Sequence, residues 1–275
     1  YIRGRFESRP MEDIIDEVKK LAKSGYKEII LIAQDTTKYG IDIYGKPKLA
    51  ELLKKLCKID GIKWIRFLYA YPETIDDKLI KVVKKNEKIC KYFDIPIQHI
   101  SDSVLKRMNR KSNSESIELL IKKLREKIPN VIIRTTVMVG FPGETQEDFE
   151  KLCNFVESAK FDKLGAFAYS KEEGTPAAKL KEQVHPMTKK ARYNKIMEIQ
   201  QKVSEENLNK YIGKELEVLV EGKTIDGKYY VCRSYMDVPD IDGLIYLNNS
   251  KELKIGDFVK CTIKSSINEY DLLGE

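Results

Sequence analysis

A regular alternation of amphipathic helical patterns with short apolar runs is the feature that most restricts how this chain can fold. The five apolar runs are predicted strands, and their lack of apolar–polar alternation is typical of a parallel sheet covered by helices. Such repeats fold either as a parallel α/β barrel or as an open doubly wound sheet. Because the chain opens on a helix that ends near Gly25, a partner strand is expected upstream of Tyr1. The predicted strands lie at residues 28–33, 64–69, 92–97, 131–139 and 163–169, and helical patterns lie at residues 48–58, 75–85, 101–108, 114–127 and 145–160.

The pattern changes after a long, charged amphipathic helix that is predicted at residues 188–210. Short strand patterns follow, separated by turn sequences such as Asp226-Gly227 and Asp242-Gly243. They lie at residues 216–220, 229–233, 244–247, 258–263 and 270–273, and their number and spacing indicate a small all-β barrel. We therefore expect three parts: an α/β body over residues 1–187, a linking helix over residues 188–211 and a β-barrel over residues 212–275.

Composition excludes several classes of protein. No run approaches the ~20 apolar residues that a membrane-spanning helix needs, and no signal peptide opens the chain, so we expect a cytoplasmic location. None of the five cysteines forms a CxxC pair, which argues against a zinc ribbon and against a disulfide framework. Cys57 and Cys153 lie on the apolar faces of helical patterns and are predicted to be buried, inert thiols. The other three are Cys90, Cys232 and Cys261.

The carboxyl ends of the predicted strands carry polar, aromatic or glycine-rich sequences, and ligands bind at these ends in parallel α/β proteins. The run that ends at Val139 continues into Gly140-Phe141-Pro142-Gly143, where glycine lets the backbone bend or approach a ligand. An ordinary tight loop before a helix, begun by a Thr145–Asp148 capping box, explains this segment equally well.

The strand ends show a pocket without a nucleophile paired to a base, so the chemistry is expected to come from a cofactor. His99 either forms a dyad with Asp35 or serves as a hydrogen-bonded wall residue. Arg134 lies inside a buried strand and therefore needs an anionic partner, which is either a ligand carboxylate or a structural acid.

Several motifs in order along the whole chain resemble the radical S-adenosylmethionine methylthiotransferase family, and specifically its RimO-type branch. They are RGRFESRP, LIAQDTTKYG, YFDIPIQH, LKRMNR, RTTVMVGFPGET, DKLGAFAYSKEEGTPA and RSYMDVPDIDG. The resemblance implies a partial parallel (β/α) barrel of the TIM-like type, followed by a small TRAM β-barrel. It also implies an enzyme that methylthiolates an aspartate of a small-subunit ribosomal protein, with S-adenosyl-L-methionine and two 4Fe–4S clusters as cofactors.

The resemblance also sets expectations about what the chain contains. The family's CxxxCxxC loop is followed by a segment like Arg3–Pro10, so the cluster cysteines are expected upstream of Tyr1 and no metal ligand is expected within this chain. A fragment of this kind is expected to be inactive alone. The implied cofactor contacts are Gln34 and Asp35 for the methionine amino end, Arg134 for its carboxylate, Gln98, His99 and Ser101 for the ribose, and Val139, Gly140, Phe141, Gly143 and Tyr169 for the adenine.

The substrate has a rival within the same family, since its MiaB-type branch methylthiolates a tRNA adenosine. A TRAM barrel that binds RNA is expected to be basic, whereas residues 212–275 hold 8 Lys and Arg against 12 Asp and Glu, although the whole chain has a net charge of +7. Asp237, Asp240 and Asp242 share one loop, and an acidic surface there suits a basic ribosomal protein. These aspartates equally fit a simple turn with solvated side chains.

A third possibility is a non-catalytic module that binds the ribosome or RNA through the basic opening of the chain, with Arg3, Arg5 and Arg9. We favour the ribosomal-protein substrate, with the ribosome as a further partner and no membrane partner.

Overall fold

The structure is a computed structural model that describes residues 4–248 and 251–275. Tyr1 and Arg3, which bear on the predictions about the start of the chain, lie outside the described residues. The chain divides into two compact units, which we describe separately. The first comprises residues 1–95 and 123–131, and the second comprises residues 96–122 and 132–275.

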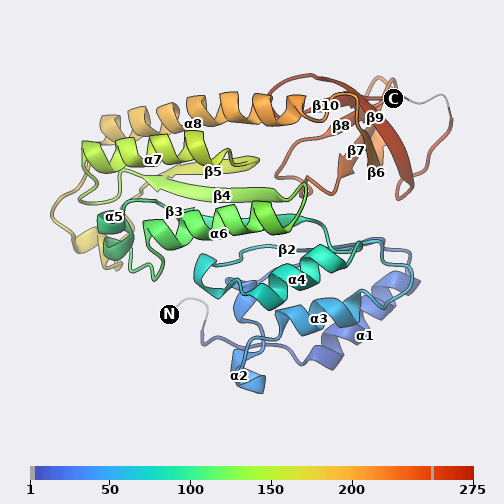
Figure 1. Cartoon of the computed structure of the whole chain (residues 1–275), viewed down its shortest axis with the longest axis horizontal. Coiled ribbons are helices and arrows are strands. Elements are labelled where there is room, and N and C mark those ends of the chain that lie inside the picture. Colours follow the sequence, from blue (N-terminus) through green and yellow to red (C-terminus); the bar gives the residue numbers. More distant parts are fainter. Residues whose placement is uncertain (1–3, 249–250) are drawn as a thin grey trace. The chain divides into compact units, whose positions relative to one another are not determined.

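The first unit is built on a parallel pair of strands, β1 (Glu28–Leu31) and β2 (Trp64–Phe67), in which Glu28 pairs with Trp64 and Leu31 with Phe67. Helices α1 (Met11–Lys23), α3 (Leu49–Leu56) and α4 (Asp77–Lys85) belong to this unit, and α3 lies between the other two (Figure 1). Their apolar faces form a core in which Leu53 and Leu56 are fully buried. The shorter elements are η1 (Thr36–Lys38), α2 (Ile41–Tyr44) and η2 (Pro72–Thr74).

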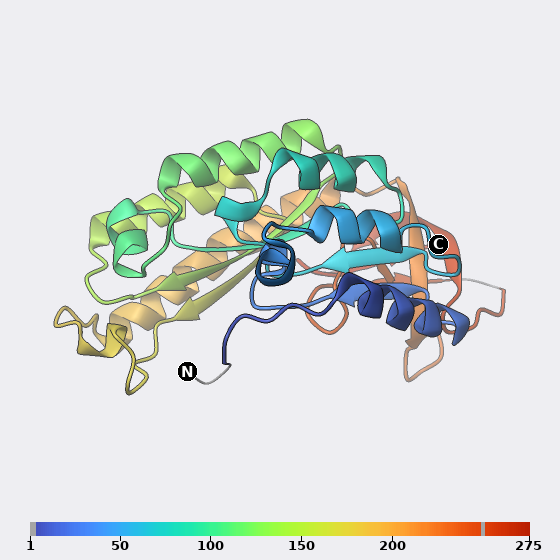
Figure 2. The same cartoon turned by 90° about the horizontal axis from the view of Figure 1, so that it is seen from below.

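A three-stranded sheet organises the second unit. Its order is β3 (Tyr92–Gln98), β4 (Ile132–Val139) and β5 (Lys163–Ala168), and β4 and β5 run parallel from Arg134–Lys163 to Val139–Ala168. Helices α7 (Gln146–Ala159) and α8 (Pro186–Asn209) lie side by side over one face of β4 and β5 (Figures 1 and 2). The remaining elements are α5 (Asp102–Arg107), η3 (Ala177–Lys179) and α6 (Ser114–Lys127), whose last turns belong to the first unit.

The second unit ends in a closed five-stranded barrel that follows α8. Its strand order is β10-β8-β7-β6-β9, and every pair is antiparallel except β10 with β8. Closure leaves no unpaired sheet edge along these strands. The strands are β6 (Glu215–Lys223), β7 (Tyr230–Ser234), β8 (Ile245–Leu247), β9 (Phe258–Ser266) and β10 (Leu272–Gly274).

The structure confirms every predicted strand and helix, with boundaries shifted by a few residues. It also confirms the capping box, in which the Thr145 and Asp148 side chains each accept from the other residue's backbone N–H. Neighbouring strands β3, β4 and β5 follow chain order, as in a β/α barrel, whereas a doubly wound sheet reverses its order at a switch point. In the described part of the chain, no helix combines the length and the apolar character that crossing a membrane requires.

Packing around Gly243 gives a test of the β-barrel. A Cβ atom at this position would collide with the backbone carbonyl of Tyr270, whereas a Cβ at Gly222 in the same barrel would meet open space. We expect Gly243→Ala to lower the free energy of unfolding by about 1–3 kcal/mol, because backbone atoms must move to make room. Gly222→Ala is the control and should change it by less than about 1 kcal/mol. Urea unfolding of both variants makes the comparison, and equal stabilities would contradict the close approach of Gly243 to the Tyr270 backbone.

Candidate functional site

A buried carboxylate joins the carboxyl ends of β3 and β4. The Glu144 side chain is fully buried, and its Oε1 lies 3.3 Å from Nε2 of His99, which follows β3. The backbone N–H of Gly140, directly after β4, donates to Oε2 of the same carboxylate. Arg192 on α8 lies 3.1 Å from Oε2 and also donates to the Glu144 carbonyl. Glu144 therefore ties two strand ends and one helix together.

The hydrogen bonds assign the state of His99. Its Nδ1 accepts from the backbone N–H of Ser101 at 2.9 Å, so this nitrogen carries no proton. The proton then sits on Nε2, which donates to Glu144. Of the two predicted roles for His99, this arrangement favours the hydrogen-bonded wall residue, because both ring nitrogens are occupied and the residue is fully buried.

Ser101 is held by a second buried carboxylate. Its hydroxyl donates to Oδ1 of Asp148, which also accepts from Ser103 at 2.9 Å. The other oxygen, Oδ2, accepts from Thr145 N at 3.0 Å. Burial would raise the pKa of Asp148, but the hydrogen bonds from Ser101, Thr145 and Ser103 outweigh burial and lower the pKa to about 2.

Two aromatic rings meet beyond the ends of β4 and β5. Phe141 and Tyr169 pack edge to face with their centroids 5.3 Å apart, and Tyr169 N donates to the Val139 carbonyl at 2.9 Å. Both rings are buried in a cluster with Val104, against which Met108, Met138, Ala177 and Leu180 pack. The Tyr169 hydroxyl is buried and has no hydrogen-bond partner among the described residues. It is a polar atom that a bound ligand would satisfy.

Both glycines of the GFPG turn are required by the structure. Gly140 has φ +70° and Gly143 has φ +83°, a region that side-chain-bearing residues rarely adopt. A Cβ at Gly140 would collide with the Lys189 side chain, and a Cβ at Gly143 would collide with Arg107. Lys189 itself donates to the Tyr169 carbonyl at 2.9 Å, and burial lowers its pKa.

In the first unit, the residues after β1 form their own hydrogen-bonded group. Asp35 is buried, accepts from the backbone N–H and the hydroxyl of Thr37, and pairs with Lys38 at 2.7 Å. Thr37 is hydrogen-bonded in turn to Thr74, which follows β2. Gln34 is exposed beside this group. Gln34 and Asp35 thus lie at a carboxyl edge, as the sequence predicted, and their cofactor contacts remain predictions.

The acidic loop of the β-barrel is not the exposed surface that the sequence suggested. Asp237 pairs with Lys163 on β5 at 2.9 Å and also accepts from the Ser234 hydroxyl, and it is buried. Asp242 lies 3.7 Å from Arg134 on β4, and its side chain is only 3% exposed. The prediction of an acidic docking surface is therefore wrong for Asp237 and Asp242, because both carboxylates neutralise cations of the α/β body. Of the three aspartates only Asp240 is exposed.

The position of Arg134 likewise contradicts its predicted contact with a methionine carboxylate. Arg134 is the third residue of β4, and Gly140 follows that strand six residues later, roughly 20 Å away at the usual strand rise. Its structural acid, Asp242, was the alternative partner that the sequence left open. Lys163, the neighbour of Arg134 on β5, is also held by acids: burial would lower its pKa, but Asp237 and Asp242 outweigh burial and raise it.

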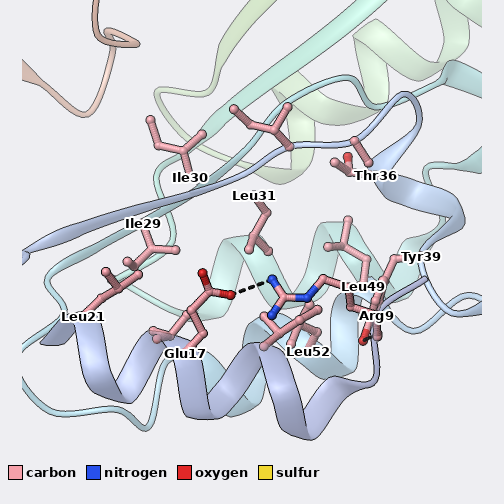
Figure 3. Close-up of a pocket in the computed structure, with 14 residues that line it drawn as sticks. Arg9, Glu17, Leu21, Ile29, Ile30, Leu31, Thr36, Tyr39, Leu49 and Leu52 are labelled. Atoms are coloured by element: carbon pink, nitrogen blue, oxygen red, sulfur yellow. Dashed lines mark hydrogen bonds and ion pairs between the residues drawn. The ribbon is translucent and has the colours of Figure 1, made fainter. Parts of the chain in front are cut away.

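A separate apolar pocket of about 330 Å³ lies in the first unit between α1, α3 and β1. Ile29 and Leu31 point into it while Ile30 points to the other side of the strand, and the Arg9–Glu17 ion pair of 2.6 Å lies across it (Figure 3). Among the described residues β1 pairs only with β2, and the pocket lies beside this strand. The lining of this pocket is mostly apolar, so it suits an apolar group better than a polar ligand.

The cysteines do not fit an iron–sulfur cluster. All five are free, and no group of three His, Cys, Asp or Glu side chains within residues 4–248 and 251–275 is arranged to hold a metal ion. Burial raises the pKa of Cys57 and Cys153, and it raises that of Cys232 to about 12 and that of Cys261 to about 11. Because iron is bound by thiolates, these buried thiols are poor ligands. Cys57 and Cys153 are half-buried rather than fully buried as predicted.

Sequence reasoning placed Glu144 at this edge without a role, and it missed Arg192 and Lys189. Glu144 was visible as the last residue of the RTTVMVGFPGE run, where a glutamate beside buried apolar residues signals a paired carboxylate. Arg192 and Lys189 had no comparable signal, because they lie among the many charged residues of a long helix.

Strands β3, β4 and β5 follow chain order, and their carboxyl ends form an edge that suits a ligand. These features define a protein of the partial β/α-barrel class with an appended β-barrel. Comparison with known proteins gives the family. Residues 1–156, more than half of the chain, match the Radical SAM superfamily, and residues 212–275 match the TRAM domain. The chain belongs to the Radical SAM superfamily and carries a TRAM domain.

Three relatives illustrate the similarity, and each is named ribosomal protein uS12 methylthiotransferase RimO. The protein from Alkaliphilus oremlandii is 61% identical over 275 residues, which are 100% of this chain and 63% of that protein. Those from Thermoanaerobacter sp. and Clostridioides difficile are 55% and 52% identical over 100% of this chain and 62% and 61% of their own lengths. The chain therefore spans less than two thirds of the length of these relatives.

A solved structure supports the fold. The coproporphyrinogen III oxidase HemN from Escherichia coli superposes with a TM-score of 0.51 at 17% identity, covering 68% of this chain and 44% of that one. This likeness confirms the partial barrel that the sequence and the strand order indicated.

The acidic loop generates a stability prediction. We expect Asp237→Asn to lower the free energy of unfolding by about 3–5 kcal/mol, because it leaves the Lys163 ammonium buried without its carboxylate. Asp240→Asn in the same loop is the matched control and should change it by no more than about 0.5 kcal/mol, since Asp240 is exposed. Chemical unfolding followed by circular dichroism measures both. Similar values for the two variants would show that the loop is a solvated turn.

Asp148 generates a pH prediction. Its pKa is about 2 in the folded chain against 3.8 ordinarily, so its ionised form stabilises the fold above about pH 4 and this stabilisation is lost as the pH falls towards 2. We expect Asp148→Asn to lower the free energy of unfolding by about 2 kcal/mol near pH 7, and the deficit should shrink below about pH 4. Urea titrations across this range test the prediction, with Glu147→Gln as an exposed control. A deficit that is constant with pH would refute the assignment.

Proposed function

We propose that the full-length protein containing this chain is a radical S-adenosylmethionine methylthiotransferase that acts on an aspartate of ribosomal protein uS12. The observation that carries the proposal is the 61% identity, over all 275 residues, to a protein of that name. The other relatives described above carry the same name, which supports the ribosomal-protein branch over the tRNA branch. The proposal places the protein in the cytoplasm, where it meets its ribosomal substrate.

The electrostatic argument for a protein substrate is weaker than the sequence suggested. Residues 212–275 carry a net charge of −4, from 8 basic and 12 acidic residues. This sum includes Asp237 and Asp242, whose carboxylates are already paired with Lys163 and Arg134 inside the second unit and are not open to a partner. The proposal for Asp240 as a substrate contact stands on its exposure alone. The choice of substrate therefore rests on similarity and not on the charge of the TRAM barrel.

We propose that S-adenosylmethionine binds at the carboxyl edge. When bound, it supplies the methyl group and the carbon radical that opens an unreactive C–H bond. In the second unit, Gln98 would approach the ribose, and the Val139–Gly143 backbone and Tyr169 would flank the adenine. The unpartnered Tyr169 hydroxyl and the left-handed Gln98 (φ +69°) support this placement, because buried orphan polar atoms and strained residues concentrate at ligand sites. In the first unit, Gln34 and Asp35 would face the methionine amino end.

His99 and Ser101 would lie on the ribose side of the cofactor, where they would position the loop after β3. Both side chains are occupied, His99 by Glu144 and Ser101 by Asp148, so they order the backbone after β3. The 4Fe–4S clusters would be held by other cysteines of the full-length protein, because no group of side chains among the described residues is arranged to hold a metal ion. This chain alone would then lack activity.

A reconstitution experiment tests the function. The full-length protein is purified without oxygen, supplied with iron and sulfide, and incubated with S-adenosylmethionine, a reductant and ribosomal protein uS12. We expect uS12 to gain the mass of one methylthio group in place of one hydrogen, located to an aspartate by fragmentation mass spectrometry. A protein that assembles its clusters and cleaves S-adenosylmethionine but leaves uS12 unchanged would refute the substrate.

A tRNA binding assay separates the two branches. Phosphate contacts make RNA affinity fall steeply with salt, so tight binding of tRNA that weakens with salt and is lost without residues 212–275 would favour the tRNA branch. We expect weak tRNA binding, since this segment holds fewer cations than anions.

A further inference from the structure

Tyr69 has a backbone conformation that its side chain disfavours. It follows β2 and has φ +59°, in the left-handed region where a Cβ atom crowds the neighbouring carbonyl. Glycine, asparagine and aspartate enter this region most readily, whereas an aromatic residue is uncommon there. A position that only needed to turn the chain would be better served by glycine.

The surrounding structure holds Tyr69 in this conformation. The buried Asp94 carboxylate accepts from the Tyr69 N–H at 3.0 Å, and the Asp94 carbonyl accepts from the next amide, Ala70, at 2.8 Å. Thr36 N donates to the Tyr69 carbonyl at 3.1 Å, and the Thr36 hydroxyl donates to the Leu68 carbonyl at 2.7 Å. Groups from β3 and from the segment after β1 thus converge on the two peptide units that flank the Tyr69 Cα atom.

The same contacts leave the side chain of Tyr69 open. It is 41% exposed, although the residues on either side of it, Leu68 and Ala70, are buried. It stands at the carboxyl end of β2, the edge where parallel β/α proteins hold their ligands. An exposed aromatic ring on a strained and tightly held backbone is an arrangement that folding alone does not require.

We propose that Tyr69 is a substrate-binding residue whose hydroxyl donates a hydrogen bond to the carboxylate of the target aspartate. The inference rests on the proposed function and deepens it, because it names a residue that recognises the acidic side chain. A phenol is a neutral donor and suits a carboxylate that must be held without a tight ion pair.

Exposure favours the protein substrate over the cofactor as the partner of this ring. A small cofactor is enclosed by its site, with most of its own surface buried. Tyr69 instead offers much of its ring to solvent, where a segment of a macromolecular substrate can reach it.

The test compares three replacements in the reconstituted full-length protein. Tyr69→Phe removes only the hydroxyl, and we expect KM for uS12 to rise roughly 10- to 100-fold, the effect of one lost hydrogen bond to a charged group. KM for S-adenosylmethionine should stay unchanged. Tyr69→Gly and Tyr69→Asn relieve the left-handed strain, so they should unfold at the same or a higher temperature than the wild type while they lose uS12 affinity. Tyr26→Phe, another exposed tyrosine of the first unit, is the control and should behave as wild type.

Binding without turnover supplies an independent readout. Fluorescence anisotropy of labelled uS12 should show weaker binding to Tyr69→Phe than to the wild type, and this difference should vanish when the modified aspartate of uS12 is replaced by asparagine. Unchanged uS12 binding by an active Tyr69→Phe enzyme would overturn the inference, as would a change confined to S-adenosylmethionine. A large loss of stability in Tyr69→Gly would show a structural role instead. A wild type that fails to modify uS12 refutes the proposed function itself, so the two failures are distinguishable.

Discussion

The buried carboxylate of Glu144 is the interaction on which the arrangement of the second unit's ligand edge depends. A charged group without solvent must have its lone pairs occupied, and Glu144 meets this requirement with His99, Gly140 and Arg192. Each partner comes from a different element, so satisfying one carboxylate places the end of β3, the end of β4 and α8 together. The tautomer of His99 and the path of the glycine turn follow from the same demand.

Opposite charges organise the other end of the same sheet for a different purpose. Near the amino ends of β4 and β5, Arg134 and Lys163 meet Asp242 and Asp237 of the β-barrel loop. Buried pairs of this kind contribute specificity of docking more than net stability, since desolvation offsets much of their attraction. One end of the sheet therefore suits a ligand, while the other end attaches the TRAM domain.

Strain marks positions that packing does not explain. Tyr69 and Gln98 both have left-handed backbones and both follow or end a parallel strand. Neighbouring hydrogen bonds maintain such conformations, and function is the usual reason for keeping them. The two residues differ in exposure, because Tyr69 offers an exposed ring while Gln98 is only partly accessible.

The sequence by itself determined the elements and their order, because a continuous apolar run, a helical stripe or a capping pair such as Thr145 and Asp148 acts through residues close together in the chain. It also located the carboxyl edge, through the glycines at 140 and 143. Only the tertiary structure decided the partners of the charged residues. In the sequence, Asp237 and Asp242 look like parts of a solvated turn. The cations that pair with them, Lys163 and Arg134, lie 74 and 108 positions away in the chain. Which charge meets which is set by long-range packing, and no local pattern encodes it.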